Sequence, residues 1–478
     1  MTTAQPRISF RGWSLILVGV TFVLHLASSL YMRAIYANGY DLSIFDQAIR
    51  HYARFEAPIS MSLEQDANTL GEHFSPIVAL AAPLYWIWDD PRMLLALQSA
   101  LVAVSVLVVL RFARRHVSDR LALVFGFGYA LGWPLQGLTA FDFHEIAFAV
   151  PLLALAIDAL DRRDDRALLL WGIALLTVRE DMGLILITLG MVRALRTPRR
   201  WFGLVLVGIG VVAYVVVTAV IIPALSVTDT WRFWSYDALG TDLPSSVRTI
   251  VTDPVTAVRL FLTPEPKLTT LVLLFLPVVF VLFRSPYTLV LVPLLAARFW
   301  SSRENLWGVD FHYNSIVWVV VVLAAIHAVS LLPSTVNMSV ARVVAGTMAV
   351  MAVFGTLLAP SAFKIGTWPR VAISDDSIQR DLNEQRTEMI AQIPAGTCAV
   401  GDTNALSHLL PTNVIGIPGR WSRPADFQLL DRANENPQVS DRAIDEALDD
   451  GYVEVASTER LVLLRSADYT GPTDGCRP

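Results

Sequence analysis

Ten ionisable residues stand inside or beside apolar stretches of the sequence, where a charged side chain could not face lipid. An ionisable group at bilayer depth costs at least about 2.5 kcal/mol, so we expect each one to face a polar cavity or a protein interface. The set comprises Asp41, Asp46, His73, Asp142, His144, Glu145, Arg179, Glu180, Asp181 and His312. Such side chains move protons or bind phosphate in enzymes, and they line substrate paths in transporters. The sequence therefore predicts a membrane enzyme or transporter whose function resides in a polar cavity.

Two aspartates follow the first apolar stretch, in the segment Gly39-Tyr-Asp41-Leu-Ser43-Ile-Phe-Asp46-Gln. A carboxylate at the mouth of a cavity could accept a proton from an incoming hydroxyl group or help to hold a divalent metal. The structural alternative is that Asp41 caps a helix beginning near Ser43, because aspartate is a favoured N-cap residue. These residues alone leave both interpretations open.

Two histidine–acid pairs are expected on the same side of the membrane. Glu72-His73 precedes one apolar helix, and Asp142-Phe-His144-Glu145 stands at the start of another. Histidine with acidic neighbours can bind a transition metal or recognise phosphate, but a sequence gives no distances. The alternative for Asp142 and Glu145 is that they complement a helix dipole.

Three consecutive charges, Arg179-Glu180-Asp181, interrupt the apolar segment 167–192. A purely structural ion network is one explanation, in which Arg179 pairs with Glu180 or with Asp46 across a cavity. The other explanation is a substrate-binding role, because a segment this apolar does not lie at a water-exposed surface, where three consecutive charges would be ordinary.

A later external loop brings two arginines, Arg298 and Arg303, close in sequence to His312 and Tyr313. A guanidinium group binds phosphate oxygens through two parallel hydrogen bonds. We expect this loop to contribute to a phosphate site.

The composition indicates a membrane protein. Hydrophobic residues make up 54% of the chain and charged residues only 17%, and the mean hydropathy is +0.52. These values exceed what the surface of a soluble protein can hide. No basic patch suggests nucleic acid as a partner. Clusters of arginine before the first span and after later ones place the N-terminus in the cytoplasm by the positive-inside rule.

The apolar pattern predicts an α-helical polytopic module over residues 1–360, with about 10–11 membrane segments. The basic clusters make residues 33–91 one external loop, within which 76–88 lies along the membrane interface because roughly 20 residues are needed to cross. Segment 167–192 runs between two basic clusters that both belong inside. It is therefore expected to form a re-entrant hairpin of two half-length helices with its tip at the cavity floor, or alternatively a single buried span.

Residues 368–478 are less apolar and predict a small α/β soluble domain. Counting the predicted membrane crossings from a cytoplasmic N-terminus makes this domain extracytoplasmic. An oxidising compartment would allow a disulfide between the only two cysteines, Cys398 and Cys476. No CxxC, HExxH, phosphate-binding glycine loop or nucleophile elbow occurs in the chain. The predicted elements are helices at 379–393 and 441–448, strands at 397–400 and 426–430, and a closing hairpin at 453–455 and 461–464.

Several of these motifs together resemble a bacterial and archaeal family of polytopic membrane proteins catalogued as a domain of unknown function. That family looks like a branch of the GT-C glycosyltransferases, which take a sugar from a polyprenyl-phosphate donor on the outer face of the membrane. The resemblance covers most of the chain. Its motifs are Asp41-Leu-Ser-Ile-Phe-Asp46-Gln47, His73-Phe-Ser-Pro76, Phe143-His144-Glu145, Arg179-Glu180-Asp181, Phe311-His312-Tyr313 and Ala425-Asp-Phe-Gln-Leu-Leu-Asp431.

In GT-C enzymes an early carboxylate of the external loop is the usual catalytic base, which the resemblance assigns to Asp41, with Asp46 as second choice. The paired acidic residues of some relatives are absent, since Leu42 follows Asp41. The resemblance therefore leaves metal dependence open. A divalent metal is the one candidate cofactor, and its ligands are unknown.

The resemblance implies a multi-pass glycosyltransferase of the plasma membrane. It would transfer a sugar from a polyprenyl-phosphate donor to an envelope glycan, lipid or protein, with its external domain binding the acceptor. The alternatives are a transporter or flippase of a lipid-linked substrate, and a non-catalytic envelope assembly protein. Besides Asp41 and Asp46 as catalytic residues, the expected substrate-binding residues are Gln47, His73, His144, Glu145, Arg179, Glu180, Asp181, Arg298, Arg303, His312 and Tyr313.

Overall fold

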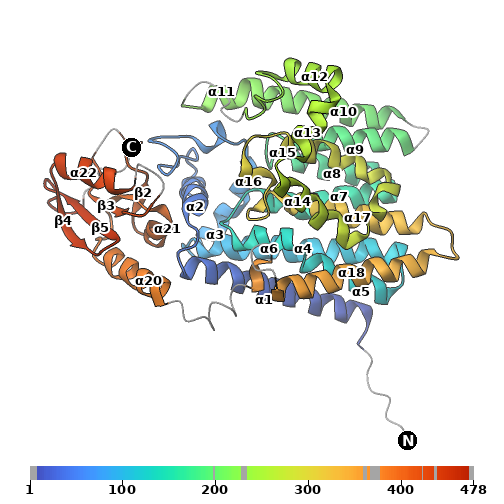
Figure 1. Cartoon of the computed structure of the whole chain (residues 1–478), viewed down its shortest axis with the longest axis horizontal. Coiled ribbons are helices and arrows are strands. Elements are labelled where there is room, and N and C mark those ends of the chain that lie inside the picture. Colours follow the sequence, from blue (N-terminus) through green and yellow to red (C-terminus); the bar gives the residue numbers. More distant parts are fainter. Residues whose placement is uncertain are drawn as a thin grey trace, which may run out of the picture.

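A computed structural model describes the chain over residues 8–196, 200–227, 234–358, 363–366, 377–421, 424–434 and 439–472. A large helical module is followed by a small domain built around a sheet (Figure 1). This confirms the predicted fold class. The boundary expected between residues 360 and 368 falls largely outside the described residues.

Five helices of the described part are long and apolar enough to cross a membrane. Two bent pairs would raise that number to seven. The first is α5 (Asp119–Ala130) with α6 (Trp133–Ala140), and the second is α13 (Pro254–Leu262) with the run Glu265–Val278 of α14 (Glu265–Phe275) and η4 (Leu276–Val278). The other apolar helices are shorter and include α7 (Ile146–Arg162) and α15 (Leu291–Phe299). The five long ones are α1 (Phe10–Ala34), α4 (Arg92–His116), the run Arg200–Leu225 of α10 (Arg200–Val216), η3 (Val217–Ile221) and α11 (Ile222–Leu225), the run His312–Ser330 of η7 (His312–Asn314) and α17 (Ser315–Ser330), and α18 (Asn337–Leu358).

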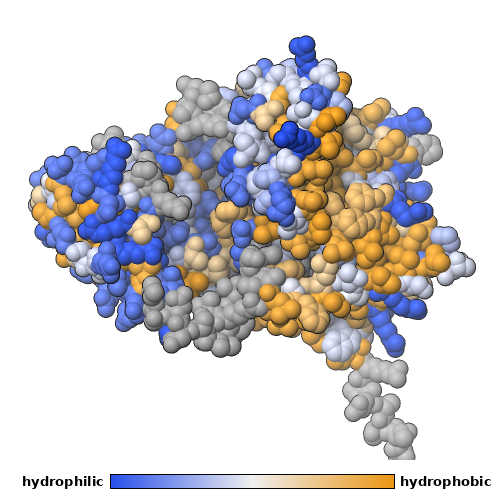
Figure 2. Space-filling model, viewed as in Figure 1, coloured by the Kyte–Doolittle hydropathy of each residue, from blue (hydrophilic) through white to orange (hydrophobic). Residues whose placement is uncertain are grey.

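The surface of the helical module carries the apolar band that a membrane requires. Figure 2 shows hydrophobic residues over the helices at the right of the view, between hydrophilic residues on the C-terminal domain at the left and on the right-hand rim. Leu204 and Val212 of α10 are 62% and 61% exposed. A water-soluble surface rarely carries so large an apolar patch. The protein is therefore a multi-pass membrane protein.

The interrupted segment 167–192 folds as an antiparallel helical hairpin of α8 (Asp165–Leu176) and α9 (Met182–Arg196). The first residue of α8 meets the last turn of α9, because Arg193 Nε lies 2.6 Å from Asp165 Oδ1. Helices of 12 and 15 residues span roughly 18 and 22 Å, less than the roughly 30 Å hydrocarbon core. The predicted hairpin is thus confirmed, and its tip is the non-helical segment 177–181.

Glycines let α9 pack closely against α10. A Cβ atom added to Gly203 would lie 2.5 Å from the carbonyl oxygen of Gly190, and one added to Gly210 would lie 2.6 Å from that of Gly183. Small residues at such positions allow the backbones of two membrane helices to approach. The seam fixes the hairpin against the long helix beside it.

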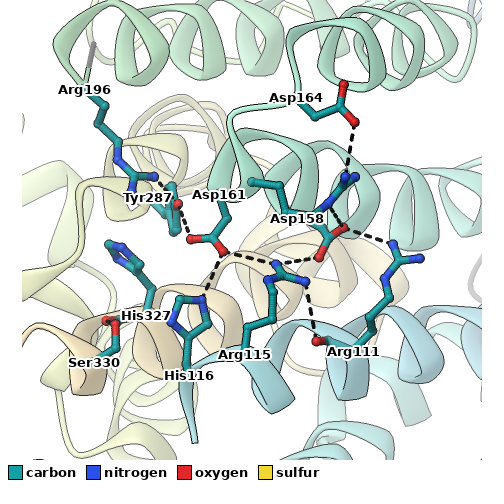
Figure 3. Close-up of polar contacts among 11 residues, drawn as sticks. Arg111, Arg115, His116, Asp158, Asp161, Asp164, Arg196, Tyr287, His327 and Ser330 are labelled. Carbon is teal, nitrogen blue, oxygen red and sulfur yellow. Dashed lines mark hydrogen bonds and ion pairs between the residues drawn. The ribbon is translucent and has the colours of Figure 1, made fainter.

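The ends of α4, α7 and α9 that are remote from the hairpin tip are joined by polar contacts (Figure 3). His327 of α17 lies beside them, with its ring against those of His116 and Tyr287. Asp158 of α7 is fully buried and pairs with Arg115 at 2.7 Å and with Arg111 and Arg162 at 3.0 Å. Next to it, Asp161 accepts a hydrogen bond from Tyr287 Oη at 2.9 Å, and Tyr287 in turn contacts Arg196 of α9. We call Arg111, Arg115, Asp158, Asp161, Arg162, Arg196 and Tyr287 together the far-end cluster.

The external loop 33–91 is largely folded against the module. Helix α2 (Tyr40–Ala53) is followed by η1 (Thr69–Gly71), and then by η2 (Pro76–Ala81) and α3 (Ala82–Tyr85), which form the segment expected at the interface. Trp86 and Ile87 at its end are 62% and 80% exposed. An interfacial position would cover them, and it stays a prediction.

The C-terminal domain is a five-stranded sheet in the order β2-β1-β3-β5-β4. Strand β1 pairs in parallel with β2 and β3, and β5 pairs antiparallel with β3 and β4. The predicted strands, helices and closing hairpin are confirmed, but β2 was not predicted. The elements are α20 (Ser377–Ile390), β1 (Cys398–Gly401), α21 (Thr403–Leu406), β2 (Val414–Gly416), β3 (Phe427–Asp431), α22 (Asp441–Asp449), β4 (Tyr452–Ser457) and β5 (Leu461–Ser466).

Cys398 is disulfide-bonded. Cys476, its expected partner, lies outside the described residues. A disulfide is typical of a domain in an oxidising compartment.

The C-terminal domain docks on the end of α1 and on the external loop. Arg33 Nη2 donates a hydrogen bond to the carbonyl oxygen of Ser407 at 3.1 Å. The backbones approach closely at Gly39, where an added Cβ would lie 2.7 Å from Cα of Asn404. Only a glycine fits between the start of α2 and the C-terminal domain.

Candidate functional site

Four segments that are distant in sequence meet at the end of the module that faces the C-terminal domain. They are the start of α2, the non-helical segment 141–145 before α7, the hairpin tip 177–181, and the turn η7 that leads into α17. Two adjoining cavities lie between them and share His73, His144, Arg303 and Tyr313 in their walls. The predicted polar cavity is therefore present.

The two cavities differ in their linings. The first, of about 390 Å³, has one wall of aliphatic side chains that includes Leu239, Leu243 and Val247, and we call it the apolar cavity. The second, of about 280 Å³, is lined by Asp41, Glu72 and His312, and we call it the polar cavity. Charged and polar residues, His73, His144 and Arg303 among them, lie between the two cavities.

Asp41 faces the polar cavity because another carboxylate caps its helix. Helix α2 begins at Tyr40, and Asp142 Oδ2 accepts hydrogen bonds from the backbone nitrogens of Gly39 and Asp41 at 2.9 and 3.0 Å. The alternative that Asp41 is itself the cap of a helix near Ser43 is wrong. Burial and the charge of Asp41 raise the pKa of Asp142 to about 7.

A continuous chain of charged groups leads from Asp41 to the hairpin tip. His144 Nε2 lies 3.5 Å from Asp41 Oδ2, and His144 Nδ1 lies 2.7 Å from Glu145 Oε2. Glu145 Oε1 is 3.5 Å from Arg179 Nη1, and Arg179 binds both carboxylate oxygens of Asp181 at 2.8 and 2.7 Å. The sequence predicted these residues but not these pairs, because Arg179 pairs with Asp181 and Glu145 rather than with Glu180 or Asp46.

His144 is held in its protonated form. Burial alone would lower its pKa, but the charge of Glu145 and hydrogen bonds to Asp41 and Glu145 outweigh burial and raise the pKa to about 10. A cation thus lies between the Asp41 and Glu145 carboxylates at neutral pH. The chain is a network of alternating charge with one end in the polar cavity.

The second histidine–acid pair is made with a residue of the hairpin tip. His73 Nδ1 lies 2.8 Å from Glu180 Oε1, and the backbone nitrogen of Phe74 donates to Glu180 Oε2 at 3.2 Å. Glu180 therefore ties the external loop to the hairpin. Both His73 and Glu180 line the apolar cavity.

Arg298 and His312 have bonding capacity left for a ligand. Arg298 is 3% exposed and donates from Nε to the carbonyl oxygen of Tyr313 and from Nη1 to that of Leu294. His312 is 1% exposed and stacks on His144 with ring centroids 3.7 Å apart. Neither ring nitrogen of His312 has a hydrogen-bond partner among the described residues. Buried polar groups are normally paired, so a ligand in the polar cavity would pair with His312 and one in the apolar cavity with Arg298.

Two predicted site residues lie elsewhere. Asp46 is fully buried and binds Arg50 Nε at 2.7 Å and the hydroxyl group of Tyr85 at 2.6 Å. Gln47 donates to the carbonyl oxygen of Ile415 at 3.0 Å and accepts from the backbone nitrogen of Met61 at 2.8 Å. Neither lines the two cavities. Both follow Asp41 in α2, but they point to other faces of that helix, where they bind the interfacial segment and the C-terminal domain.

Aromatic residues of the apolar cavity were not predicted as site residues. Tyr214 of α10 and Trp234 and Tyr236 after it line its wall, and Tyr236 donates to the carbonyl oxygen of Ala297 at 2.8 Å. Nothing in their spacing distinguishes them from ordinary interfacial aromatics.

Within the described ranges, no group of three or more His, Cys, Asp or Glu side chains is placed to hold a metal ion.

Comparison with solved structures gives the class of fold. The structure of ArnT from Cupriavidus metallidurans bound to undecaprenyl phosphate aligns over 97% of this chain and 99% of its own, with a TM-score of 0.57 and 14% identity. The apo form of the same protein aligns over 98% and 99%, with a TM-score of 0.54 and 12% identity. At these identities the likeness concerns the fold alone, and it identifies the fold as GT-C-like.

The chain belongs to the DUF2079 family of predicted membrane proteins, whose model matches residues 32–439. The resemblance drawn from the sequence motifs is thereby confirmed. No curated protein is a significant match.

Proposed function

We propose that the protein is an inverting membrane glycosyltransferase that moves a sugar from polyprenyl phosphate to an envelope acceptor. One observation carries this proposal: the charged chain from Asp41 to Asp181 lies between a polar and an apolar cavity. A base on one side and a lipid-compatible wall on the other suit a hydroxyl acceptor and a lipid-linked donor. The GT-C-like fold supports the same reaction class, as an analogy.

The donor would occupy the apolar cavity. Its aliphatic wall suits a polyprenyl chain, and ArnT, whose fold this chain shares, has been solved with undecaprenyl phosphate bound. Arg298 and Arg303 line that cavity, and their guanidinium groups would bind the phosphate. Arg179 is already neutralised by Asp181 and Glu145, so it would act on the phosphate more weakly.

The reaction moves one proton from the acceptor hydroxyl group to Asp41. It also replaces the bond between the anomeric carbon and the phosphate oxygen by one to the acceptor oxygen. The acceptor oxygen would attack the anomeric carbon from the polar cavity while its proton passes to Asp41. The bond from that carbon to the phosphate oxygen would break, and its electron pair would leave with the phosphate. Attack from the side opposite the phosphate inverts the anomeric centre. Arginines at the developing charge stabilise the transition state.

Protonated His144 would orient Asp41, and His312 and His73 would position sugar or phosphate oxygens. The site would face outward, since the far-end cluster at the opposite end holds arginines that belong inside by the positive-inside rule. The N-terminus would then be cytoplasmic and the C-terminal domain extracytoplasmic. A divalent metal is the one candidate cofactor, and adding Mg²⁺ or Mn²⁺ to the assay tests it.

The test measures release of polyprenyl phosphate from a panel of polyprenyl-phosphate sugars in lipid nanodiscs, with and without Mg²⁺ or Mn²⁺. Asp41→Asn keeps the shape but not the base, so we expect the rate to fall about a hundredfold or more. Asp119→Asn, a half-exposed carboxylate in the membrane module far from the site, is the matched control and should retain full activity. Intact donors with the wild-type protein, or an active Asp41→Asn variant, would overturn the proposal and favour the transporter or assembly protein.

A further inference from the structure

A third cavity, of about 440 Å³, lies between the external loop and the C-terminal domain, and we call it the outer cavity. Its walls come from three parts of the chain: the external loop, the segment after α11, and the loop that follows β2. The lining residues are Tyr40, Leu63, Glu64, Ala67, Asn68, Gly71, Glu72, Ser226, Val227, Gly419 and Arg420.

The outer cavity adjoins the polar cavity. Tyr40, Leu63 and Glu72 line both, so these three side chains form the boundary between them. Tyr40 directly precedes Asp41 in the first turn of α2. A molecule in the outer cavity would therefore lie next to the cavity that holds the proposed base, and the outer cavity shares no lining residue with the apolar cavity.

The lining of the outer cavity is polar. Glu64, Asn68, Glu72, Ser226 and Arg420 supply hydrogen-bonding groups, and the Tyr40 side chain adds an aromatic ring. Hydroxyl-rich molecules need such a mixture, because carboxylates and amides pair with hydroxyl groups while an aromatic ring covers the less polar face of a sugar. The long aliphatic wall that a lipid tail would need belongs to the apolar cavity instead.

Contacts with the C-terminal domain hold the outer cavity together. Arg420 Nη1 donates to the carbonyl oxygen of Leu63 at 2.9 Å, and Trp421 Nε1 donates to that of Met61 at 3.0 Å. Gly419 turns with φ +74°, a conformation that favours glycine. The C-terminal domain is thus one wall of this cavity.

We propose that the outer cavity is the acceptor site and that the acceptor is a hydroxyl-rich glycan that arrives from the aqueous side rather than a lipid. This inference rests on the proposed glycosyltransferase function. One hydroxyl group of the glycan would pass the boundary at Glu72 and give its proton to Asp41. Its oxygen would bond to the anomeric carbon as the phosphate leaves with the electron pair of the broken bond.

The experiment separates acceptor binding from donor chemistry. Val227→Trp fills the outer cavity from an exposed position, and Glu64→Gln removes a charged hydrogen-bond acceptor from its wall. Val255→Trp, at a 78% exposed position that lines none of the three cavities, is the matched control. The probes are labelled maltotetraose, mannotetraose and chitotetraose, with diacylglycerol as the lipid acceptor. Saturation-transfer NMR on Asp41→Asn protein measures glycan binding without turnover.

We expect at least one oligosaccharide to bind and to be glycosylated. Val227→Trp and Glu64→Gln should raise its KM about tenfold or more while leaving the donor KM and donor hydrolysis without acceptor unchanged. Unchanged acceptor KM values in both variants, or a donor-cleaving enzyme that uses only diacylglycerol or no oligosaccharide, would overturn the acceptor assignment. Failure of the wild type to cleave any donor would instead overturn the proposed function.

Discussion

His144 is the residue on which the charge balance of the candidate site depends. It is stacked on His312 and placed between two carboxylates. Because its pKa is raised above the ordinary value of 6.5 to about 10, the folded protein binds a proton that the unfolded chain releases over the same pH range. The site should therefore lose stability as the pH rises.

We predict that this loss is visible in thermal unfolding of wild type and His144→Gln in nanodiscs. The difference in Tm should be largest below about pH 6.5, shrink from there upward, and vanish above about pH 10. The charge of Glu145 is the largest influence that raises the pKa, so a Glu145→Gln background should flatten the profile. A Tm difference that stays constant from pH 6 to 10.5 would contradict this account.

The types of the site residues could be read from the sequence, but their partners could not. Charges within apolar stretches are costly, which is why Asp41, His144 and Arg179 stood out. The contact of Asp142 with the start of α2 joins residues about a hundred positions apart, and no local pattern encodes it. Asp46 and Gln47 are close to Asp41 in sequence and lie in the same helix, yet they are not in the site. Asp46 binds Tyr85 and Gln47 binds the C-terminal domain instead.

At the scale of elements, the starts of α7, α9 and α17 lie at or next to the site, and their other ends meet in the far-end cluster. Asp158 is the centre of that cluster, since it pairs with arginines of two helices. The cluster fixes these helices relative to one another at the end remote from the chemistry.

We predict that Asp158→Ala lowers the free energy of unfolding by roughly 3 kcal/mol, because three guanidinium groups then lose their buried partner. Their partial exposure to water keeps the effect at the lower end for a buried ion pair. Asp119→Ala breaks a half-exposed pair with Arg114 and should cost about 1 kcal/mol or less. Denaturant titration in micelles measures the free energy of unfolding of both variants. Equal losses would contradict the prediction that the far-end cluster stabilises the fold more than the half-exposed pair does.

Helices with a clear apolar period and a charged break were predicted well, including the α8–α9 hairpin. The hairpin followed from topology, since two basic clusters required both of its ends on one side. Strand β2 was missed because Val414–Gly416 is only three residues long and has no period to detect. Its identity as a strand comes from pairing with β1, which is a tertiary fact.

For the whole molecule, we predict the orientation from the positions of the two ends. Helix α1 begins at the rim opposite the C-terminal domain (Figure 1). A phosphatase that folds only outside the cytoplasm should be active when fused after Pro478 and inactive when fused before Met1. A fluorescent protein that matures only in the cytoplasm is the matched control and should give the reverse result. The opposite pair of signals would place the candidate site on the inner face.

The close approach of Gly39 to Asn404 implies an order of events during biosynthesis. Asp41 lies two residues after Gly39, and the domain against which Gly39 packs follows the whole membrane module in the chain. A nascent chain would carry its base, its arginines and its hairpin in the membrane before the outer cavity has its second wall. We expect such an unfinished chain to transfer no sugar, because its acceptor site lacks the wall that Gly419 and Arg420 supply. Glycan modification would then begin only once translation and export of the whole chain are complete.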